Sequence, residues 1–339
     1  MPPNLLPQRL ALEYFSTRFQ TSDQAVIKAN MTATNVPDKG RDTLIESLLA
    51  SSPHNPALLE KFHIPRFKLR LATIDAWGVE KGERLLDIGC GQGESSVALA
   101  AVVGDTGNVT AIDTAPMDYG HPFTMREAQQ HIRNSALGPR ISFYPVDAAS
   151  FLTDIWKPKD APIGGAVLCQ CLFYFPNESE VQSLFTTISN AGIARIYAAE
   201  WSYTPSHEPQ VAHVLATRAQ ALYHLYDAER PPDPRDQNVR SGVDQQAILR
   251  AAKLAGYRVA KETLVTPEQD MREGQFEVEY VLGPSFEQRV KNARRSQVQE
   301  TEINDAIQEL QTELEKPLYS GTTNVMAMDV WCAVFELQQ

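Results

Sequence analysis

The sequence contains little cysteine and no long apolar run, and each of these absences excludes a class of protein. Its 339 residues include four cysteines, with no C-x-x-C pair and no cluster of histidines beside them. Neither a disulfide framework nor a metal site is therefore expected. No apolar run approaches the roughly 20 residues that cross a bilayer, and residues 1–19 lack the basic and apolar segments of a signal peptide. We predict a cytoplasmic protein with no metal and no membrane partner.

Two of the cysteines, Cys169 and Cys171, form a C-x-C pattern inside an apolar run. Because side chains alternate along a strand, both thiols are expected on one face of a strand. A metal or redox role would need further ligands, which the neighbouring sequence does not supply. Both are predicted to be buried structural residues.

Basic residues are also in deficit. Lys and Arg number 31 against 42 Asp and Glu, which gives a formal net charge of -11, whereas proteins that bind nucleic acid normally carry a basic surplus. The chain is 43% hydrophobic, so it can bury a large core. These numbers favour a globular protein whose partner is a small molecule.

Short β-rich runs alternate with helical ones from residue 84 onwards, the pattern of a doubly wound α/β sheet. The pattern predicts four parts, with a helical N-terminal cap first, then a ligand-binding core, a lid insertion and the rest of the sheet with its own helical insertion. These parts are residues 1–57, 58–201, 202–243 and 244–339, and the helical insertion is 266–324. The seven expected strands are residues 84–89, 108–113, 141–147, 165–172, 194–201, 257–265 and 325–337.

A glycine-rich turn follows the first of these strands. Gly89, Gly91 and Gly93 stand in the segment DIGCGQGE with the spacing G-x-G-x-G, whereas dinucleotide-binding folds use G-x-G-x-x-G or G-x-G-x-x-A. Glu94 comes where the next helix begins, and its charge would oppose a pyrophosphate bound at that helix N-terminus. The turn therefore favours an adenosine ligand without phosphates over NAD or FAD.

Carboxylates near the ends of three expected strands support the same ligand. Asp87 precedes the first glycine by two residues, Asp113 ends the second strand and Asp147 ends the third. A carboxylate at the position of Asp113 can accept hydrogen bonds from both hydroxyls of a ribose. The order of strand, acidic residue, glycines and helix resembles the D/E-x-G-x-G-x-G motif of class I S-adenosylmethionine-dependent methyltransferases.

This resemblance implies a seven-stranded Rossmann-like sheet and S-adenosylmethionine as the cofactor. The implied reaction moves a methyl group to an oxygen or nitrogen of a small organic acceptor and releases S-adenosylhomocysteine. The resemblance also implies that Asp147 lies near the adenine amino group and the N–H of Ala148 near the ring. The residues expected to bind the cofactor are Asp87, Gly89, Cys90, Gly91, Gly93, Asp113, Thr114, Asp147, Ala148 and Gln170.

The acceptor is expected near the carboxyl ends of the fourth and fifth strands, because ligands of open α/β sheets lie outside those ends. Methyl transfer from a sulfonium is an in-line displacement, so holding the acceptor atom about 3 Å from the methyl carbon can supply most of the catalysis. The acid–base candidates are His121, Tyr174 and Glu200. The candidates for binding the acceptor are Cys171, Phe173, Trp201, Tyr203, His213 and His224.

Two alternatives remain open from the residues alone. An NAD-dependent oxidoreductase is disfavoured by Glu94 and by the glycine spacing. A cofactor-binding scaffold or rearrangement catalyst of the same fold, which methylates nothing, is suggested by the lack of an obvious catalytic base. Nucleic acid is not an expected partner, given the acidic balance.

Overall fold

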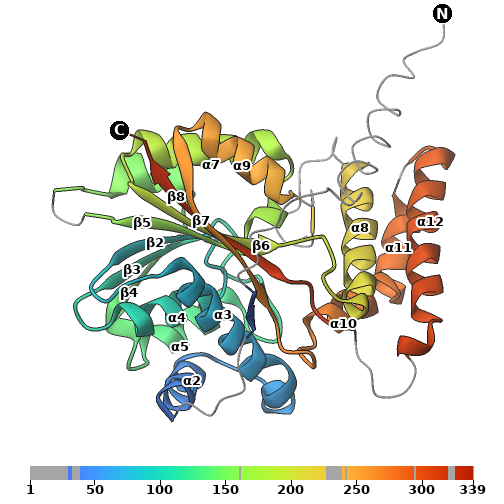
Figure 1. Ribbon diagram of the computed structural model, residues 1–339, viewed down its shortest axis with the longest axis horizontal. Helices are drawn as coiled ribbons and strands as arrows, with labels where there is room; N and C mark the ends of the chain where they lie inside the picture. The colour runs from blue at the N-terminus through green and yellow to red at the C-terminus, as the bar shows by residue number, and fades with distance from the viewer. Residues whose placement is uncertain are drawn as a thin grey trace, which may run out of the picture.

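The protein is built around a single mixed β-sheet (Figure 1). The computed structural model describes residues 30–32, 39–159, 162–226, 239–240, 243–293, 295–319 and 325–338. The strand order is β1-β7-β8-β6-β5-β2-β3-β4, and β8 runs antiparallel to both of its neighbours while all other pairs are parallel. The strands are β1 (Asn30–Thr32), β2 (Arg84–Ile88), β3 (Asn108–Ile112), β4 (Ile141–Tyr144), β5 (Gly165–Cys169), β6 (Arg195–Trp201), β7 (Tyr257–Thr266) and β8 (Val330–Leu337).

The seven strands expected from the sequence are all present, so the doubly wound α/β prediction is confirmed. Strand β1 is an addition, lying parallel to β7 within a segment that was expected to be helical. Its three residues, Asn30 to Thr32, are too few to show the alternation that marks a strand in a sequence. The last expected strand also begins later than predicted, at Val330.

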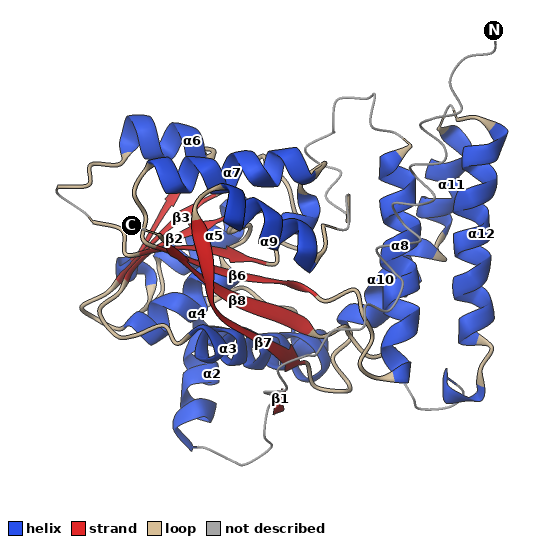
Figure 2. Ribbon diagram, turned by 45° about the horizontal axis from the view of Figure 1, so that its top comes forward, coloured by secondary structure: helices blue, strands red, loops and turns tan. Residues whose placement is uncertain are grey.

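Helices cover both faces of the sheet, as Figure 2 shows. Strand β5, in the middle of the sheet, is buried along its whole length, which explains why its sequence is a continuous apolar run. The helices on one face are α2 (Lys39–Ser51), α3 (Ile64–Trp77), α4 (Glu94–Val103) and α5 (Met125–Arg133), and those on the other are α6 (Ala148–Ser150), α7 (Glu178–Asn190) and α9 (Gln245–Leu254).

Helix α3 matters most for the site that follows. It has Pro65 in its first turn and is capped after Trp77 by Gly78, whose φ of 75° is left-handed. Phe67, Leu71 and Ile74 are spaced three and four apart and are all buried in the same apolar cluster. Arg70 falls on this same side of the helix, so the sequence places a cation in the core.

A second group of helices stands beside the sheet (Figure 1). It lies on the side where β6 ends, because the chain leaves β6 and enters α8 after a short connection. Its members pack on one another in an apolar cluster of their own. They are α8 (Val211–Leu225), α10 (Glu273–Val281), α11 (Pro284–Asn292) and α12 (Gln297–Leu314).

Candidate active site

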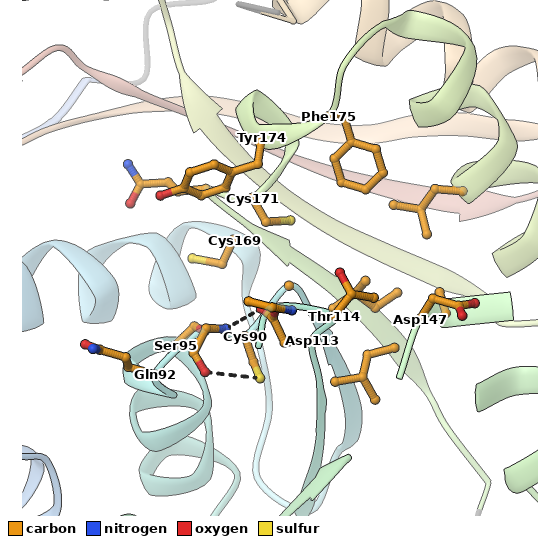
Figure 3. Close-up of a pocket in the computed structure, with 18 of the residues that line it drawn as sticks. Cys90, Gln92, Ser95, Asp113, Thr114, Asp147, Cys169, Cys171, Tyr174 and Phe175 are labelled. Carbon is orange, nitrogen blue, oxygen red and sulfur yellow. Dashed lines mark hydrogen bonds between the residues drawn. The ribbon is translucent and has the colours of Figure 1, made fainter. Parts of the chain in front are cut away.

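A cavity of about 740 Å³ lies at the carboxyl ends of β2, β3, β4 and β5. This is where ligands bind in open α/β sheets. Figure 3 shows Cys90, Gln92 and Asp113 on one side of the space, with Tyr174 and Phe175 on the other. The residues expected to bind a ligand that line this cavity are Gly89, Cys90, Gly91, Asp113, Thr114, His121, Asp147, Ala148, Gln170, Cys171 and Tyr174.

The glycine turn between β2 and α4 requires glycine at three positions. Gly89, Gly91 and Gly93 have φ values of 71°, 55° and 100°, which side chains with a Cβ rarely adopt. A Cβ on Gly91 would meet no atom within 4 Å, so this residue leaves open space at the cavity wall. A Cβ on Gly93 would lie 2.7 Å from Ile132, on the core side, and Gly93 does not line the cavity.

Replacing Gly89 by alanine is expected to cost more stability than replacing Gly192. Both glycines have similar left-handed φ values, 71° and 73°, so the backbone cost is the same, about 1–2 kcal/mol. A Cβ on Gly192 would meet nothing within 4 Å, whereas one on Gly89 would lie 2.7 Å from the Cβ of Cys171. Denaturant titration should therefore show an extra loss of about 1–3 kcal/mol for Gly89→Ala. Equal losses in the two variants would contradict the close approach.

Asp113 ties the loop after β3 to the glycine turn. Its carboxylate accepts hydrogen bonds of 2.7 Å from the backbone N–H groups of Gly91 and Ala115. A carboxylate can accept about four hydrogen bonds, so acceptor capacity remains toward the cavity that Asp113 lines. The side chain thus sets the shape of the turn and can also bind a ligand hydroxyl.

Asp147 caps the short helix α6 at the edge of the cavity. It accepts hydrogen bonds from the backbone N–H of Ser150 at 2.9 Å and from its hydroxyl at 2.8 Å. These bonds, the backbone one first, lower the pKa of the Asp147 carboxyl. The residue is exposed and lines the cavity with Ala148, whose side chain is buried.

Asp87 lies behind the glycine turn and does not line the cavity. The sequence had placed it among the residues that bind the ligand. It accepts hydrogen bonds from the hydroxyls of Ser95 and Ser96 at 2.7 and 2.6 Å. Burial raises the pKa of its carboxyl to about 6. Asp87 therefore fastens the start of α4 to the end of β2 through the two serines, which lie eight and nine residues downstream.

Glu94 lines the cavity, and Arg66 balances its charge. The Nε of Arg66 lies 2.7 Å from Glu94 Oε2, and its Nη1 lies 3.7 Å from Glu273 Oε2 on α10. The repulsion that Glu94 would exert on a pyrophosphate is therefore smaller than its position in the sequence indicates. The glycine spacing is therefore the main feature that disfavours a dinucleotide.

Among the acid–base candidates, His121 and Tyr174 line the cavity and Glu200 does not. Glu200 is 1% exposed and accepts hydrogen bonds from the backbone N–H groups of Leu172, Phe173 and Trp201 at 3.0, 3.1 and 2.9 Å. Burial raises the pKa of its carboxyl to about 8. Its contacts fix the turn η5 (Leu172–Tyr174), so the predicted catalytic role is corrected to a positioning one.

Tyr174 projects from η5 into the cavity (Figure 3). Its ring packs against Phe173, with 4.1 Å between centroids. The residue is 38% exposed, and desolvation of the hydroxyl at the cavity wall, together with Tyr119, Glu277 and Glu273, raises its pKa. Tyr174 is therefore a neutral hydrogen-bonding and aromatic group at neutral pH.

Only Cys171, of the six residues expected to bind the acceptor, lines the cavity. Trp201 and Tyr203 are about 5% and 4% exposed and belong to the core, and Phe173 packs beside it. His213 faces Trp201 edge-on at 5.3 Å and accepts a 3.0 Å hydrogen bond from the N–H of Met328.

Both histidines of α8 are kept neutral. Burial lowers the pKa of His213 to about 3. Burial also lowers the pKa of His224 to about 3, and the arginines at 289, 240 and 295 act in the same direction. Neither ring lines the cavity, so their predicted place at the acceptor is corrected: α8 directs them into the helical packing.

The two cysteines of the C-x-C pattern lie on opposite faces of the sheet, contrary to the prediction. Cys169 belongs to the cluster that contains α3 and α4, and Cys171 to the one that contains α7. The reason is Gln170, whose φ of 50° turns the chain where β5 ends. All four cysteines are buried free thiols. Within the described part of the chain no cluster of metal-ligating side chains occurs, and no helix is long and apolar enough to cross a membrane.

Sequence reasoning missed several cavity residues. Arg66 and Arg70 come from α3, and Tyr119 from the loop after β3. The signal for Arg70 was present, because it shares the apolar side of an amphipathic helix. No local pattern pointed to α10, whose Glu273 reaches Arg66 across about 200 residues of sequence.

The strand order, the antiparallel β8 and the glycine turn at the head of one cavity define the class I methyltransferase fold. The solved structure of a cyclopropane-fatty-acyl-phospholipid synthase-like protein from Lactobacillus casei matches this fold with a TM-score of 0.68. The two sequences are 23% identical, and the match covers 88% of this chain and 99% of the Lactobacillus casei chain. No protein-family model matches the chain.

Two curated relatives place the chain more narrowly. Methyltransferase phomM and methyltransferase phomM' of Diaporthe leptostromiformis are each 33% identical to it over 346 residues, covering 86% of this chain and 89% of theirs. The chain belongs to this family of methyltransferases.

Proposed function

We propose that the protein transfers a methyl group from S-adenosylmethionine to an oxygen or nitrogen of a small organic acceptor. The observation that carries this proposal is the alignment of four strand ends along one cavity of about 740 Å³, a size that suits a cofactor and a small substrate. Asp147 and Ala148 stand at the β4 end, Asp113 at β3 and the glycine turn at β2. The open space at Gly91 allows a ligand to approach the backbone closely.

The assigned roles follow the order of the strands. Asp147 and the N–H of Ala148 bind the adenine, and Asp113 binds the ribose hydroxyls. The sulfonium, when bound, supplies a methyl group that is already activated for displacement. The protein then needs mainly to hold the acceptor in line, exclude water and accept the proton that an O–H or N–H acceptor loses on methylation.

We assign the acceptor to the side of the cavity at Tyr174, behind which α10 lies without lining the cavity itself. Glu273 and Glu277 are four residues apart and share one face of α10. Glu273 lies beside Arg66, which lines the cavity, and both carboxylates act on the hydroxyl of Tyr174.

Glu277 does not line the cavity, so in this proposal it takes up the proton through Tyr174, which does line it. It is half-buried, and it accepts a 2.6 Å hydrogen bond from the Nε2 of Gln220, a fully buried side chain whose Oε1 has no partner. Burial raises the pKa of Glu277 to about 7. A carboxyl with that pKa can bind and release a proton near neutral pH.

Calorimetry with S-adenosylhomocysteine tests the cofactor, and a screen with methyl-labelled S-adenosylmethionine against small alcohols, phenols and amines tests the reaction. Binding followed by labelling of at least one acceptor class is expected. A folded protein that fails to bind S-adenosylhomocysteine but changes the fluorescence of NADH would support the oxidoreductase alternative. Binding without labelling of any acceptor would favour the non-methylating alternative.

Glu277→Gln is expected to lower kcat/KM for an acceptor found in that screen by about 100-fold, because a general base contributes roughly that much. The wild-type rate should rise as pH rises through about 7, where Glu277 loses its proton, and the variant should lack this rise. Glu279→Gln is the matched control, since Glu279 is an exposed carboxylate on the same helix. The same loss in both variants, or an unchanged pH profile, would contradict the role of Glu277.

A further inference from the structure

Arg240 brings a positive charge to the acceptor side of the cavity. It lies in the short described stretch 239–240 and lines the cavity. Its backbone N–H donates a 2.9 Å hydrogen bond to the carbonyl of Phe173 in η5. The next residue of η5, Tyr174, projects into the cavity (Figure 3). Arg240 therefore lies on the side of the cavity to which the acceptor is assigned.

Two further arginines are held over one aromatic ring in the second group of helices. The guanidinium carbons of Arg289 and Arg295 lie 5.2 and 4.1 Å from the centroid of the Tyr223 ring. Arg289 donates a 2.9 Å hydrogen bond to the hydroxyl of Tyr280, and Arg295 donates one of 2.9 Å to the carbonyl of Tyr223. These contacts hold both cations near the end of α8.

His224, which follows Tyr223 on α8, connects these two arginines with Arg240. Burial is the first cause that lowers the pKa of His224, and Arg289, Arg240 and Arg295 lower it further. Since the interaction between charges weakens with distance, all three cations lie near this ring. Arg240, Arg289 and Arg295 thus form an arginine cluster in a chain whose net charge is -11.

The positive potential of the arginine cluster reaches the cavity at Arg240. Arg295 does not line the cavity, and its Nε and Nη1 are enclosed with no hydrogen-bond partner in the described part of the chain. Arg240 does line the cavity, and charges at the wall of a cleft concentrate their field inside it. Because bringing like charges together costs free energy, an anion bound beside Arg240 would stabilise the cluster.

The rest of the cavity limits the charge of that anion. Asp113, Asp147 and Glu180 also line the cavity, and Arg66 is already paired with Glu94. These carboxylates would repel a phosphate with two negative charges more strongly than a carboxylate with one. The planar fork of a guanidinium also matches the two oxygens of a carboxylate. The surroundings therefore favour a carboxylate.

We propose that the methyl acceptor is a carboxylic acid whose carboxylate binds Arg240 of the arginine cluster, beside Tyr174. This inference rests on the proposed function, since it names the substrate class of the same site. The carboxylate anchors the molecule, and a hydroxyl or amino group of the same molecule receives the methyl group. A charge-assisted pair with a planar fork fixes the direction of the acceptor as well as its position, which an in-line displacement needs.

The test extends the labelling screen with acceptor pairs that differ only in the carboxylate. Hydroxyphenylacetate is compared with hydroxyphenylacetamide, and phenylalanine with phenylalanine amide. The wild-type protein should favour the acid of a pair by about 10- to 100-fold in kcat/KM, the range expected for hydrogen bonds between charged groups. Arg240→Met should bring this ratio to within about threefold of unity. Arg240→Lys, which keeps the charge but loses the planar fork, should lie between them.

Arg250→Met is the matched control, because Arg250 lies on α9, pairs with Glu178 at 3.0 Å and does not line the cavity. It should keep the acid-to-amide ratio of the wild-type protein. Calorimetry should show that Arg240→Met binds S-adenosylhomocysteine within about threefold of wild type, because the arginine serves the acceptor.

Three results would overturn the inference alone. They are labelling of uncharged acceptors only, an acid preference that persists in Arg240→Met, and a loss of S-adenosylhomocysteine affinity in that variant as large as its loss of activity toward acids. A wild-type protein that binds no S-adenosylhomocysteine, or labels no acceptor at all, would overturn the proposed function together with it.

Discussion

Asp113→Ala is expected to raise the dissociation constant of S-adenosylhomocysteine about 100-fold. The substitution removes the proposed acceptor of the ribose hydroxyls and the two 2.7 Å hydrogen bonds that hold Gly91 and Ala115. Two hydrogen bonds to a charged group account for a change of this size when each contributes about 1.5 kcal/mol, the lower end of the usual range. Calorimetry with the folded variant measures it.

Two further variants separate the causes. Asp113→Asn keeps the volume of the side chain and one acceptor oxygen, so an intermediate loss of about tenfold is expected. Asp105→Asn removes a carboxylate that is 87% exposed and pairs with Arg140, and it should leave the affinity unchanged. An unchanged affinity in a folded Asp113→Ala protein would count against the ribose contact.

Glu200→Gln should lower the free energy of unfolding by about 3 kcal/mol. The carboxyl group accepts three backbone hydrogen bonds, and an amide places an NH₂ donor against one of these buried N–H groups. Leaving such groups unpaired costs about 1–3 kcal/mol each. Denaturant titration checks the loss, with Glu46→Gln on the exposed side of α2 as the control. A stability within 0.5 kcal/mol of wild type, roughly the surface-substitution range, would contradict the capping role of Glu200.

The stability that Glu200 contributes to the wild-type protein should also depend on pH. Burial raises the pKa of Glu200 from its usual 4.5 to about 8, so between these values the folded protein binds a proton that the unfolded chain does not. The stability contributed by Glu200 is therefore complete below about pH 4.5 and is lost as pH rises to 8. The difference between wild type and Glu200→Gln should be larger at pH 5 than at pH 8, and a difference that does not vary with pH would contradict the raised pKa.

The fold could be predicted from the sequence because its evidence is local. Strands such as β2 and β5 are short apolar runs bounded by turn residues, and the turn at Gly89 to Gly93 needs left-handed backbone that glycine adopts readily. Strand β1 was missed for the same reason, since three residues carry no pattern and are fixed only by pairing with β7.

The sequence by itself determined which segments form strands along the chain, the glycine turn and the positions of Asp113 and Asp147 at the strand ends. Which side chains face the cavity was decided only by the tertiary structure, because each orientation depends on a partner far along the chain. Glu200 meets its donors 28 residues earlier, and His213 meets Met328 115 residues later. Arg70 meets Gln170 100 residues away. A local pattern can show that such a residue is polar and buried, but the hydrogen bond that turns it toward the cavity or away from it forms only when the sheet assembles.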